Sequence, residues 1–155
     1  MTEPEALAGL DEELARVNEY RRRGRPADSW ATLEDDLERR FAPSRRLAVY
    51  GSLAPGRSND RQLAELTGDW VSGLVVRGEL RAMGWGIHLG YPALRWSMDG
   101  DDVPVELFIS DDLAAHWPRL DRFEGRDYER ILVPLLRHGE IVEVANLYQA
   151  RTEKG

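Results

Sequence analysis

The sequence of 155 residues has no cysteine, no excess of basic residues and no long apolar run. Without cysteine, the chain cannot form a disulfide scaffold, a thiolate nucleophile or a zinc or iron–sulfur site with cysteine ligands. The 21 basic and 28 acidic residues give a net charge of −7, which argues against nucleic acid or an anionic membrane as the main partner. No apolar stretch reaches the ~18 residues of a membrane-spanning helix, and the acidic first residues do not resemble a signal peptide. We therefore expect a cytoplasmic protein.

Motifs that hold metals or nucleotides are also missing. The three histidines, His88, His116 and His138, stand apart from one another and lack the spacing of a metal site. Neither common type of glycine-rich phosphate loop occurs. Ser52 follows an apolar run, but its neighbours do not form the Gly-x-Ser-x-Gly turn of serine hydrolases. The residues alone therefore indicate no metal site, no nucleotide-binding loop and no serine hydrolase.

Residues 1–43 are predicted to form an N-terminal helical arm. Apolar residues recur there at helical spacing in two stretches, Leu7, Leu10, Leu14 and Val17 in the first and Trp30, Leu33, Leu37 and Phe41 in the second. A glycine and a proline in the segment 20–26 mark the break between the helices. We expect both apolar stripes to pack on the body of the protein, the alternative being a homodimer contact through the arm. The four arginines in the same segment have acidic neighbours and are interpreted as a solvated face.

Residues 44–155 have the pattern of strands with two helices. The predicted strands cover 47–50, 70–83, 91–96, 103–109, 128–137 and 140–150, with His138–Gly139 as a tight turn between the last two. Gly73 and Gly78 are expected to mark bulges or points of close backbone approach. Ser110 is expected to cap a helix from Asp111 to about Phe123. Together these elements predict an α+β domain built as a small, closed or nearly closed mixed β-barrel.

The first candidate site is the loop that follows the first strand, Tyr50–Gly56. Gly51 allows a ligand to approach the backbone closely, and successive N–H groups in such a turn can bind an anion. A plain surface turn explains the same residues equally well. From these residues alone, both interpretations stay open.

The second candidate site is the end of the helix that follows Ser110. Gly125 suits the left-handed position after a helix, so Glu124 and Asp121 belong to the last turn. The helix dipole disfavours carboxylates there by about 0.3–1 kcal/mol. Burial beside Phe123 would raise the pKa of a carboxyl group, as a general acid–base near neutral pH requires. The competing interpretation, favoured by these residues alone, is that nearby arginines simply pair with the two acids.

The two sites belong to an ordered series of motifs between about residues 46 and 150. The motifs are Tyr50–Gly51–Ser52–Leu53 with Pro55–Gly56, Arg77–Gly78–Glu79–Leu80, Tyr91–Pro92–Ala93–Leu94, Glu106–Leu107–Phe108, Leu120–Asp121–Arg122–Phe123–Glu124–Gly125 and Tyr128–Glu129–Arg130. In this combination the chain resembles the γ-glutamylcyclotransferase-like superfamily. The resemblance implies a small mixed barrel with flanking helices and a pocket at one barrel end. It does not extend to the arm.

The resemblance also implies a mechanism. In active members the backbone of the loop, here Gly51, Ser52 and Leu53, holds the α-carboxylate of a γ-glutamyl group. The carboxylate that matches Glu124 acts as general acid and base while the substrate's own α-amine attacks its γ-carbonyl. The products are 5-oxoproline and an amine, and no cofactor is needed.

Three tyrosines are assigned to the substrate pocket by the same resemblance. Tyr128 and Tyr148 are expected to line it, and Tyr50 begins the substrate-binding loop. For Tyr50 and Arg130 the main expected roles are structural, in barrel packing and in an ion pair.

Three functions remain in competition. The first is a cyclotransferase acting on a γ-glutamyl amine or peptide, and the second is a non-catalytic small-molecule-binding or protein-interaction module on the same fold. The third is an amidohydrolase that uses water and releases glutamate. A pocket that joins the loop amides to Glu124 favours the enzyme, whereas Glu124 locked to Arg130 favours the module.

Leu53 stands where many glutathione-pathway members have Asn, so the chain looks closer to the short bacterial and plant relatives.

Overall fold

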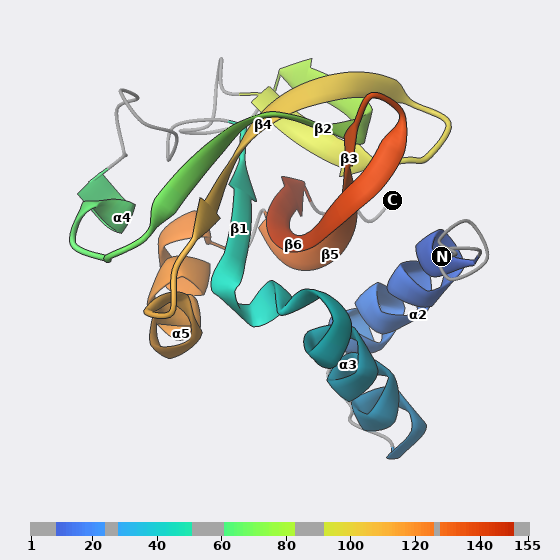
Figure 1. Cartoon of the computed structure of the whole chain (residues 1–155), viewed down its shortest axis with the longest axis horizontal. Coiled ribbons are helices and arrows are strands. Elements are labelled where there is room, and N and C mark those ends of the chain that lie inside the picture. Colours follow the sequence, from blue (N-terminus) through green and yellow to red (C-terminus); the bar gives the residue numbers. More distant parts are fainter. Residues whose placement is uncertain (1–8, 24–27, 51–60, 83–91, 126–127, 151–155) are drawn as a thin grey trace.

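A computed structural model describes residues 9–23, 28–50, 61–82, 92–125 and 128–150. Two helices come first, α2 (Leu10–Arg23) and α3 (Asp28–Phe41), followed by a short 3-10 helix, η1 (Pro43–Arg45). The remaining elements are β1 (Arg46–Val49), α4 (Arg61–Ala64), β2 (Asp69–Ala82), β3 (Pro92–Trp96), β4 (Asp101–Ile109), α5 (Leu113–Glu124), β5 (Tyr128–Arg137) and β6 (Glu140–Ala150). The strands curve around one another, and α2, α3 and α5 lie outside them (Figure 1).

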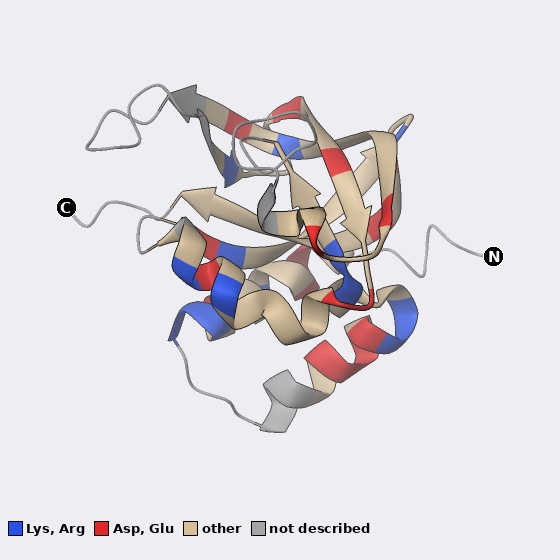
Figure 2. Ribbon diagram, turned by 90° about the vertical axis from the view of Figure 1, so that its left-hand side faces the viewer, with Lys and Arg blue, Asp and Glu red and all other residues tan. Residues whose placement is uncertain are grey.

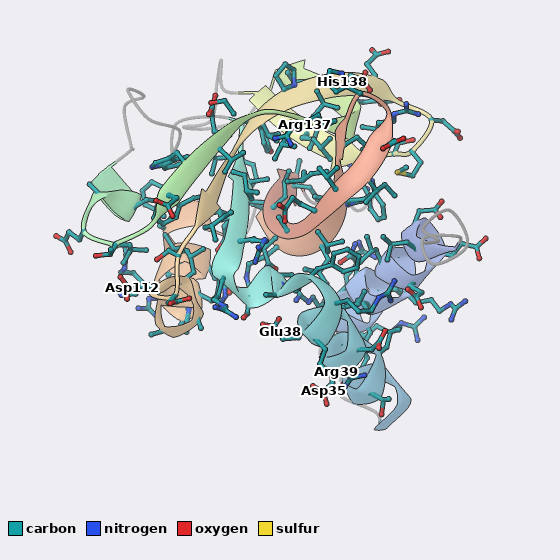
Figure 3. All side chains as sticks on the ribbon, in the orientation of Figure 1. Asp35, Glu38, Arg39, Asp112, Arg137 and His138 are labelled. Atoms are coloured by element: carbon teal, nitrogen blue, oxygen red, sulfur yellow. The ribbon has the colours of Figure 1, made fainter. Side chains whose placement is uncertain are left out.

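Five strands close into a mixed barrel, and one strand lies beyond it. The sheet order is β3-β2-β4-β1-β6-β5, and an additional pairing of β2 with β5 at Val75 and Leu136 closes the ring. The pairing of β1 with β6 is parallel, while the other strand pairs are antiparallel. The predicted α+β barrel is therefore confirmed. Its interior is filled by aliphatic side chains of the strands. Charged residues occur on both the helices and the strands (Figure 2), and many of their side chains project outward from the ribbon (Figure 3).

The turn between β5 and β6 and the two glycines of β2 have the roles that were expected of them. His138 and Gly139 both have positive φ angles, 54° and 83°, as in a type I′ turn between β5 and β6. The segment expected as one or two strands is a single strand, β2, whose register shifts between Val71 and Leu74 around Gly73. A side chain at Gly78 would meet the carbonyl oxygen of Arg95, so close backbone approach is also confirmed there.

Helix α5 begins two residues later than expected. The Ser110 hydroxyl accepts a hydrogen bond from the Asp112 N–H at 3.0 Å and donates one to the Thr67 carbonyl oxygen at 2.6 Å. The Asp112 carboxylate accepts one from the Thr67 N–H at 2.9 Å. These polar groups therefore tie the chain before the helix to the segment around Thr67, and the helix itself starts at Leu113.

The arm packs on the barrel, as expected. Leu10, Leu14, Val17 and Leu37 form one buried cluster with Leu132 of β5 and Val144 of β6. Leu7 lies outside the described residues, as does the side chain of Trp30. The contact with the body accounts for the described members of both predicted apolar stripes. A homodimer contact through the arm remains a prediction. The boundary at residue 43 remains a prediction.

One arm side chain takes the place of a strand on the open edge of β5. Within the described residues, β5 pairs with β2 only at Leu136, so the edge of its first half faces the arm. There the Asn18 amide donates to the Leu132 carbonyl oxygen at 2.9 Å and accepts from the Leu132 N–H at 2.7 Å. Both backbone groups of Leu132 are thus satisfied by a buried asparagine.

We expect Asn18→Ala to lower the free energy of unfolding by about 2–3 kcal/mol, because it leaves two buried backbone groups without partners. Urea unfolding followed by circular dichroism measures this change. Asn18→Asp serves as a second variant, because it keeps an acceptor but loses the donor. A free energy of unfolding for Asn18→Ala within 0.5 kcal/mol of that of the original chain, the ordinary effect of a surface change, would contradict the role given to Asn18.

Candidate active site at the end of helix α5

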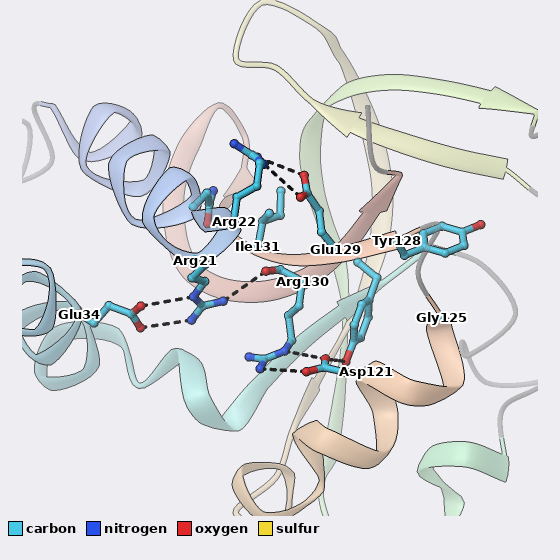
Figure 4. Close-up of a pocket in the computed structure, with 11 residues that line it drawn as sticks. Arg21, Arg22, Glu34, Asp121, Gly125, Tyr128, Glu129, Arg130 and Ile131 are labelled. Atoms are coloured by element: carbon cyan, nitrogen blue, oxygen red, sulfur yellow. Dashed lines mark hydrogen bonds and ion pairs between the residues drawn. The ribbon is translucent and has the colours of Figure 1, made fainter. Parts of the chain in front are cut away.

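A cavity of about 520 Å³ lies between the arm and the C-terminal end of α5 (Figure 4). Its wall is formed by Asn18, Arg21, Arg22, Glu34, Asp121, Gly125, Tyr128, Glu129, Arg130, Ile131 and Tyr148. The predicted pocket residues Tyr128 and Tyr148 therefore lie in one wall with Gly125, the residue directly after Glu124. Most of the wall is polar or charged, and three guanidinium groups face three carboxylates. The arm supplies a share of this wall.

The last turn of α5 is held by a charged hydrogen-bond cluster. Arg130 donates from Nε and Nη2 to the two carboxylate oxygens of Asp121, at 2.9 and 3.3 Å. The Tyr148 hydroxyl donates to the same carboxylate at 2.6 Å. The Asp121 side chain is 44% exposed, so the expected burial of a carboxylate is wrong for Asp121. For Asp121 the simpler interpretation, an ion pair with an arginine, is confirmed.

Glu124 is the last residue of α5, three residues after Asp121. Its side chain lies outside the described residues, so its predicted catalytic role stays a prediction. Arg130 was expected to bind Glu124 if the protein were a binding module. In the structure, Arg130 instead donates hydrogen bonds to both carboxylate oxygens of Asp121.

The chain leaves α5 through Gly125. Its φ of 84° confirms the predicted positive value, which favours glycine. Its ψ of −178° is extended, however, so the residue does not adopt the left-handed helical conformation that was expected. The Gly125 N–H donates to the Asp121 carbonyl oxygen at 3.1 Å, and the Gly125 carbonyl oxygen accepts from the Tyr128 N–H at 3.3 Å. Gly125 thus turns the chain directly from the helix towards β5.

Arg130 has the structural role expected of it. Besides the ion pair with Asp121, its guanidinium stacks on the Trp117 ring at 4.6 Å and donates to the Asn146 amide oxygen at 3.2 Å. These contacts join β5, β6 and α5. A lysine would lose the two-pronged hydrogen bond and the planar stacking together.

Tyr50 connects three strands at the entrance to the predicted substrate loop. Its hydroxyl donates to the Tyr148 carbonyl oxygen at 2.7 Å and accepts from the Leu94 N–H at 3.1 Å, and its ring packs against the barrel core. The expected packing role is confirmed. Gly51, Ser52 and Leu53 lie outside the described residues, so their role in substrate binding, like that of Tyr50, remains a prediction.

Two arginines of the arm lie in the cavity wall, which the sequence interpretation missed. Arg22 donates to both oxygens of Glu129 at 3.1 Å, and Arg21 donates to the Asn146 amide oxygen at 2.9 Å. Glu129, only 9% exposed, raises the pKa of the Arg22 guanidinium by accepting these bonds. The expected solvated face is therefore wrong for Arg21, whose side chain is 23% exposed. Arg22 remains exposed, as expected, although it also binds Glu129. A signal was present, because Glu129 has the same parity along the strand as Ile131, Val133 and Leu135, whose side chains pack in the barrel interior.

Two further findings concern metals and membranes. Among the described residues, no group of three or more histidine, cysteine, aspartate or glutamate side chains is arranged to hold a metal ion. In the same part of the chain, no helix combines the length and apolar content needed to cross a membrane.

The sequence profile of one protein family, described as γ-glutamyl cyclotransferase, AIG2-like, matches residues 47–154. The chain belongs to this AIG2-like family. The matched region begins in β1 and covers the whole barrel, whereas the arm precedes it. A comparison with curated proteins finds no similar sequence.

Solved structures share the AIG2-like fold. An AIG2-like protein from Mus musculus has 20% identity and a TM-score of 0.53, covering 71% of this chain and 79% of its own. YkqA from Bacillus subtilis has 23% identity and a TM-score of 0.52, but the aligned part is 69% of this chain and only 36% of YkqA. A protein from Arabidopsis thaliana has 24% identity and a TM-score of 0.50, with 72% and 71% of the two chains covered. At these identities the likeness concerns the fold.

Proposed function

We propose that the protein is a cyclotransferase that releases 5-oxoproline from a γ-glutamyl amine or a γ-glutamyl peptide. The AIG2-like family supports this class of reaction. The observation that carries the proposal is the cavity beside the end of α5, whose wall includes Tyr128, Tyr148 and Gly125. Polar walls and a charged hydrogen-bond cluster suit a small charged substrate better than an apolar one.

The barrel topology supports a single site for both candidate motifs. Because β1 and β6 are parallel, the end of β1 at Val49 and the end of β6 at Ala150 point to the same end of the barrel. Tyr128, at the start of β5, pairs with Ala150 at that end. The loop after Tyr50 therefore starts at the barrel end where the segment from Glu124 enters β5.

In the proposed reaction, the α-amine of the γ-glutamyl group forms a bond to its own γ-carbonyl carbon. The amide bond to the second half of the substrate breaks, and a five-membered lactam, 5-oxoproline, is released together with a free amine. Glu124 takes one proton from the attacking amine and returns it to the leaving nitrogen, so that no water is consumed. Since the nucleophile is part of the substrate, positioning and proton transfer are the main contributions required of the protein.

The loop residues Gly51, Ser52 and Leu53 are assigned to the substrate's α-carboxylate, which their N–H groups would bind as an anion. Tyr128 and Tyr148 are assigned to the wall of the same pocket, and Tyr50 to the entrance of the loop. The hydroxyl of Tyr148 is held by Asp121, so we assign Tyr148 a positioning rather than a proton-transfer role.

Incubation of the purified protein with a panel of γ-glutamyl amines and γ-glutamyl dipeptides, followed by mass spectrometry, tests the proposal. We expect 5-oxoproline and the free amine in equal amounts from at least one substrate. Glutamate in place of 5-oxoproline would identify an amidohydrolase instead. Binding of panel members by calorimetry without any product would identify a binding module and overturn the proposal.

A further inference from the structure

A continuous series of side-chain hydrogen bonds connects the arm to the last turn of α5. Arg21 of α2 donates from Nη1 to the amide oxygen of Asn146 at 2.9 Å. Arg130 donates from its own Nη1 to the same oxygen at 3.2 Å and, through Nε, to Asp121 at 2.9 Å. Figure 4 shows Arg21, Arg130 and Asp121 in succession along one side of the cavity. The series ends three residues before Glu124.

Asn146, which is 1% exposed, connects the two arginines of this series. Its amide nitrogen donates to the Pro43 carbonyl oxygen at 2.8 Å, and its amide oxygen accepts from both arginines. Because both acceptor positions of that oxygen are occupied and one N–H has a carbonyl partner, the amide has one preferred orientation. Removal of Arg21 would leave that oxygen with one of its two donors.

Arg21 is itself held from the opposite side by the second arm helix. The Glu34 carboxylate of α3 accepts from Nη2 and Nε of Arg21 at 3.3 and 3.4 Å. With 23% of its side chain exposed, Arg21 is shielded from most of the competing water. The guanidinium therefore lies between an arm carboxylate and a barrel amide, a geometry that a planar, five-donor group can satisfy.

We propose that Arg21 is a positioning residue for the active site, acting through Asn146, Arg130 and Asp121 on the turn of α5 that ends at Glu124. This inference rests on the proposed cyclotransferase function. It gives a catalytic purpose to the arm, which the AIG2-like family match does not include. An error of about 1 Å in the position of a catalytic group can lower the rate by a factor of 10². Loss of Arg21 could therefore slow the reaction even though Arg21 acts on Glu124 only through other residues.

The kinetic test compares Arg21→Ala with Arg23→Ala, a matched control on the same helix. Arg23 is 71% exposed and binds Glu19 one turn away. We expect Arg21→Ala to lower kcat about tenfold with little change in KM, because the general acid–base is misplaced while substrate binding is retained. Arg23→Ala should leave both constants unchanged. A kcat for Arg21→Ala equal to that of Arg23→Ala would overturn the proposal.

Amide hydrogen exchange tests the same proposal without relying on turnover. The Gly125 N–H reports on the end of α5, and the Leu132 N–H, bonded to Asn18, reports on docking of the arm. Arg21→Ala should speed exchange at Gly125 about fivefold, while exchange at Leu132 stays as in Arg23→Ala. Unchanged exchange at Gly125, or equal acceleration at both amides, would show that Arg21 has no specific link to α5.

The two measurements separate failure of this inference from failure of the proposed function. Absence of 5-oxoproline with the unmodified chain would count against the cyclotransferase, and the exchange data would then decide alone whether Arg21 supports the α5 end. Turnover by the unmodified chain with equal kcat values for Arg21→Ala and Arg23→Ala would leave the cyclotransferase intact and refute the positioning role.

Discussion

Replacing Glu124 with Gln should lower the rate of 5-oxoproline release by about 10²–10⁴-fold, the usual contribution of a general acid–base. The amide side chain has nearly the same shape, but it cannot accept the proton of the attacking α-amine or return it to the leaving nitrogen. Folding should be preserved because Glu124 is the final residue of α5 and Gln is a good helix former. Mass spectrometry of the product, with thermal unfolding measured in parallel, gives both quantities.

Glu140→Gln is the matched control for this substitution. Glu140 is exposed at the start of β6, next to the hairpin turn, at the far end of β6 from Ala150. The same change of charge there should leave turnover within twofold of the unmodified rate. Full activity of Glu124→Gln would refute the assignment of Glu124, and an equal loss in both variants would attribute the effect to net charge.

The second large effect is expected from Asp121→Ala. Its carboxylate accepts hydrogen bonds from Arg130 and from the Tyr148 hydroxyl, and all three side chains lie in the cavity wall. Without the carboxylate, the last turn of α5 loses its hydrogen bonds to Arg130 of β5 and Tyr148 of β6. We expect activity to fall about 10–100-fold through misplacement of Glu124. The free energy of unfolding should fall by about 1–2 kcal/mol, since water reaches the partly exposed pair and replaces part of what is lost.

Asp111→Ala serves as the control for Asp121→Ala. Asp111 precedes the N-terminal end of the same helix and pairs with Arg45, both side chains being largely exposed. Its removal should change neither the rate nor the stability by a measurable amount. Activity of Asp121→Ala close to that of Asp111→Ala would show that the charged cluster does not support catalysis. A loss that follows stability alone, restored at lower temperature, would give Asp121 a purely structural role.

Local patterns in the sequence were sufficient to predict most strands and both arm helices. The hairpin between β5 and β6 follows from His138–Gly139, because a two-residue turn with positive φ angles matches the twist of the flanking strands. The bulge at Gly73 and the close approach at Gly78 follow from the absence of a side chain. The hairpin and the bulge depend on residues that are neighbours in the chain, whereas the close approach at Gly78 involves Arg95 of the paired strand β3.

Contacts between segments that are distant in the sequence were harder to predict. Arg21 and Arg22 stand among acidic residues of their own helix, a pattern that usually indicates a solvated face. Which of them turns towards the barrel depends on how α2 is rotated on β5, and that rotation is set by Asn18 and the apolar cluster around Leu132. The start of α5 was misjudged for a similar reason, because Ser110 is bound by Thr67 from another part of the chain.

The candidate site also has features that the sequence predicts and features that it does not. The position of Gly125 and the pairing of an acidic residue with Arg130 were predictable from spacing. The sequence does not show which carboxylate pairs with Arg130. That partner, Asp121, depends on the direction in which the chain runs from α5 into β5. The roles of Glu124 and of the loop Gly51–Leu53 come from the family resemblance and remain predictions.

Intramolecular attack by the α-amine is the central claim, and blocking that amine tests it most directly. A γ-glutamyl amide that the protein turns over should be compared with the same compound acetylated on its α-nitrogen, in water enriched in ¹⁸O. We predict that the free compound gives 5-oxoproline without ¹⁸O and that the acetylated one is inert. Turnover of the acetylated compound to an ¹⁸O-labelled carboxylate would contradict the cyclotransferase mechanism and identify hydrolysis.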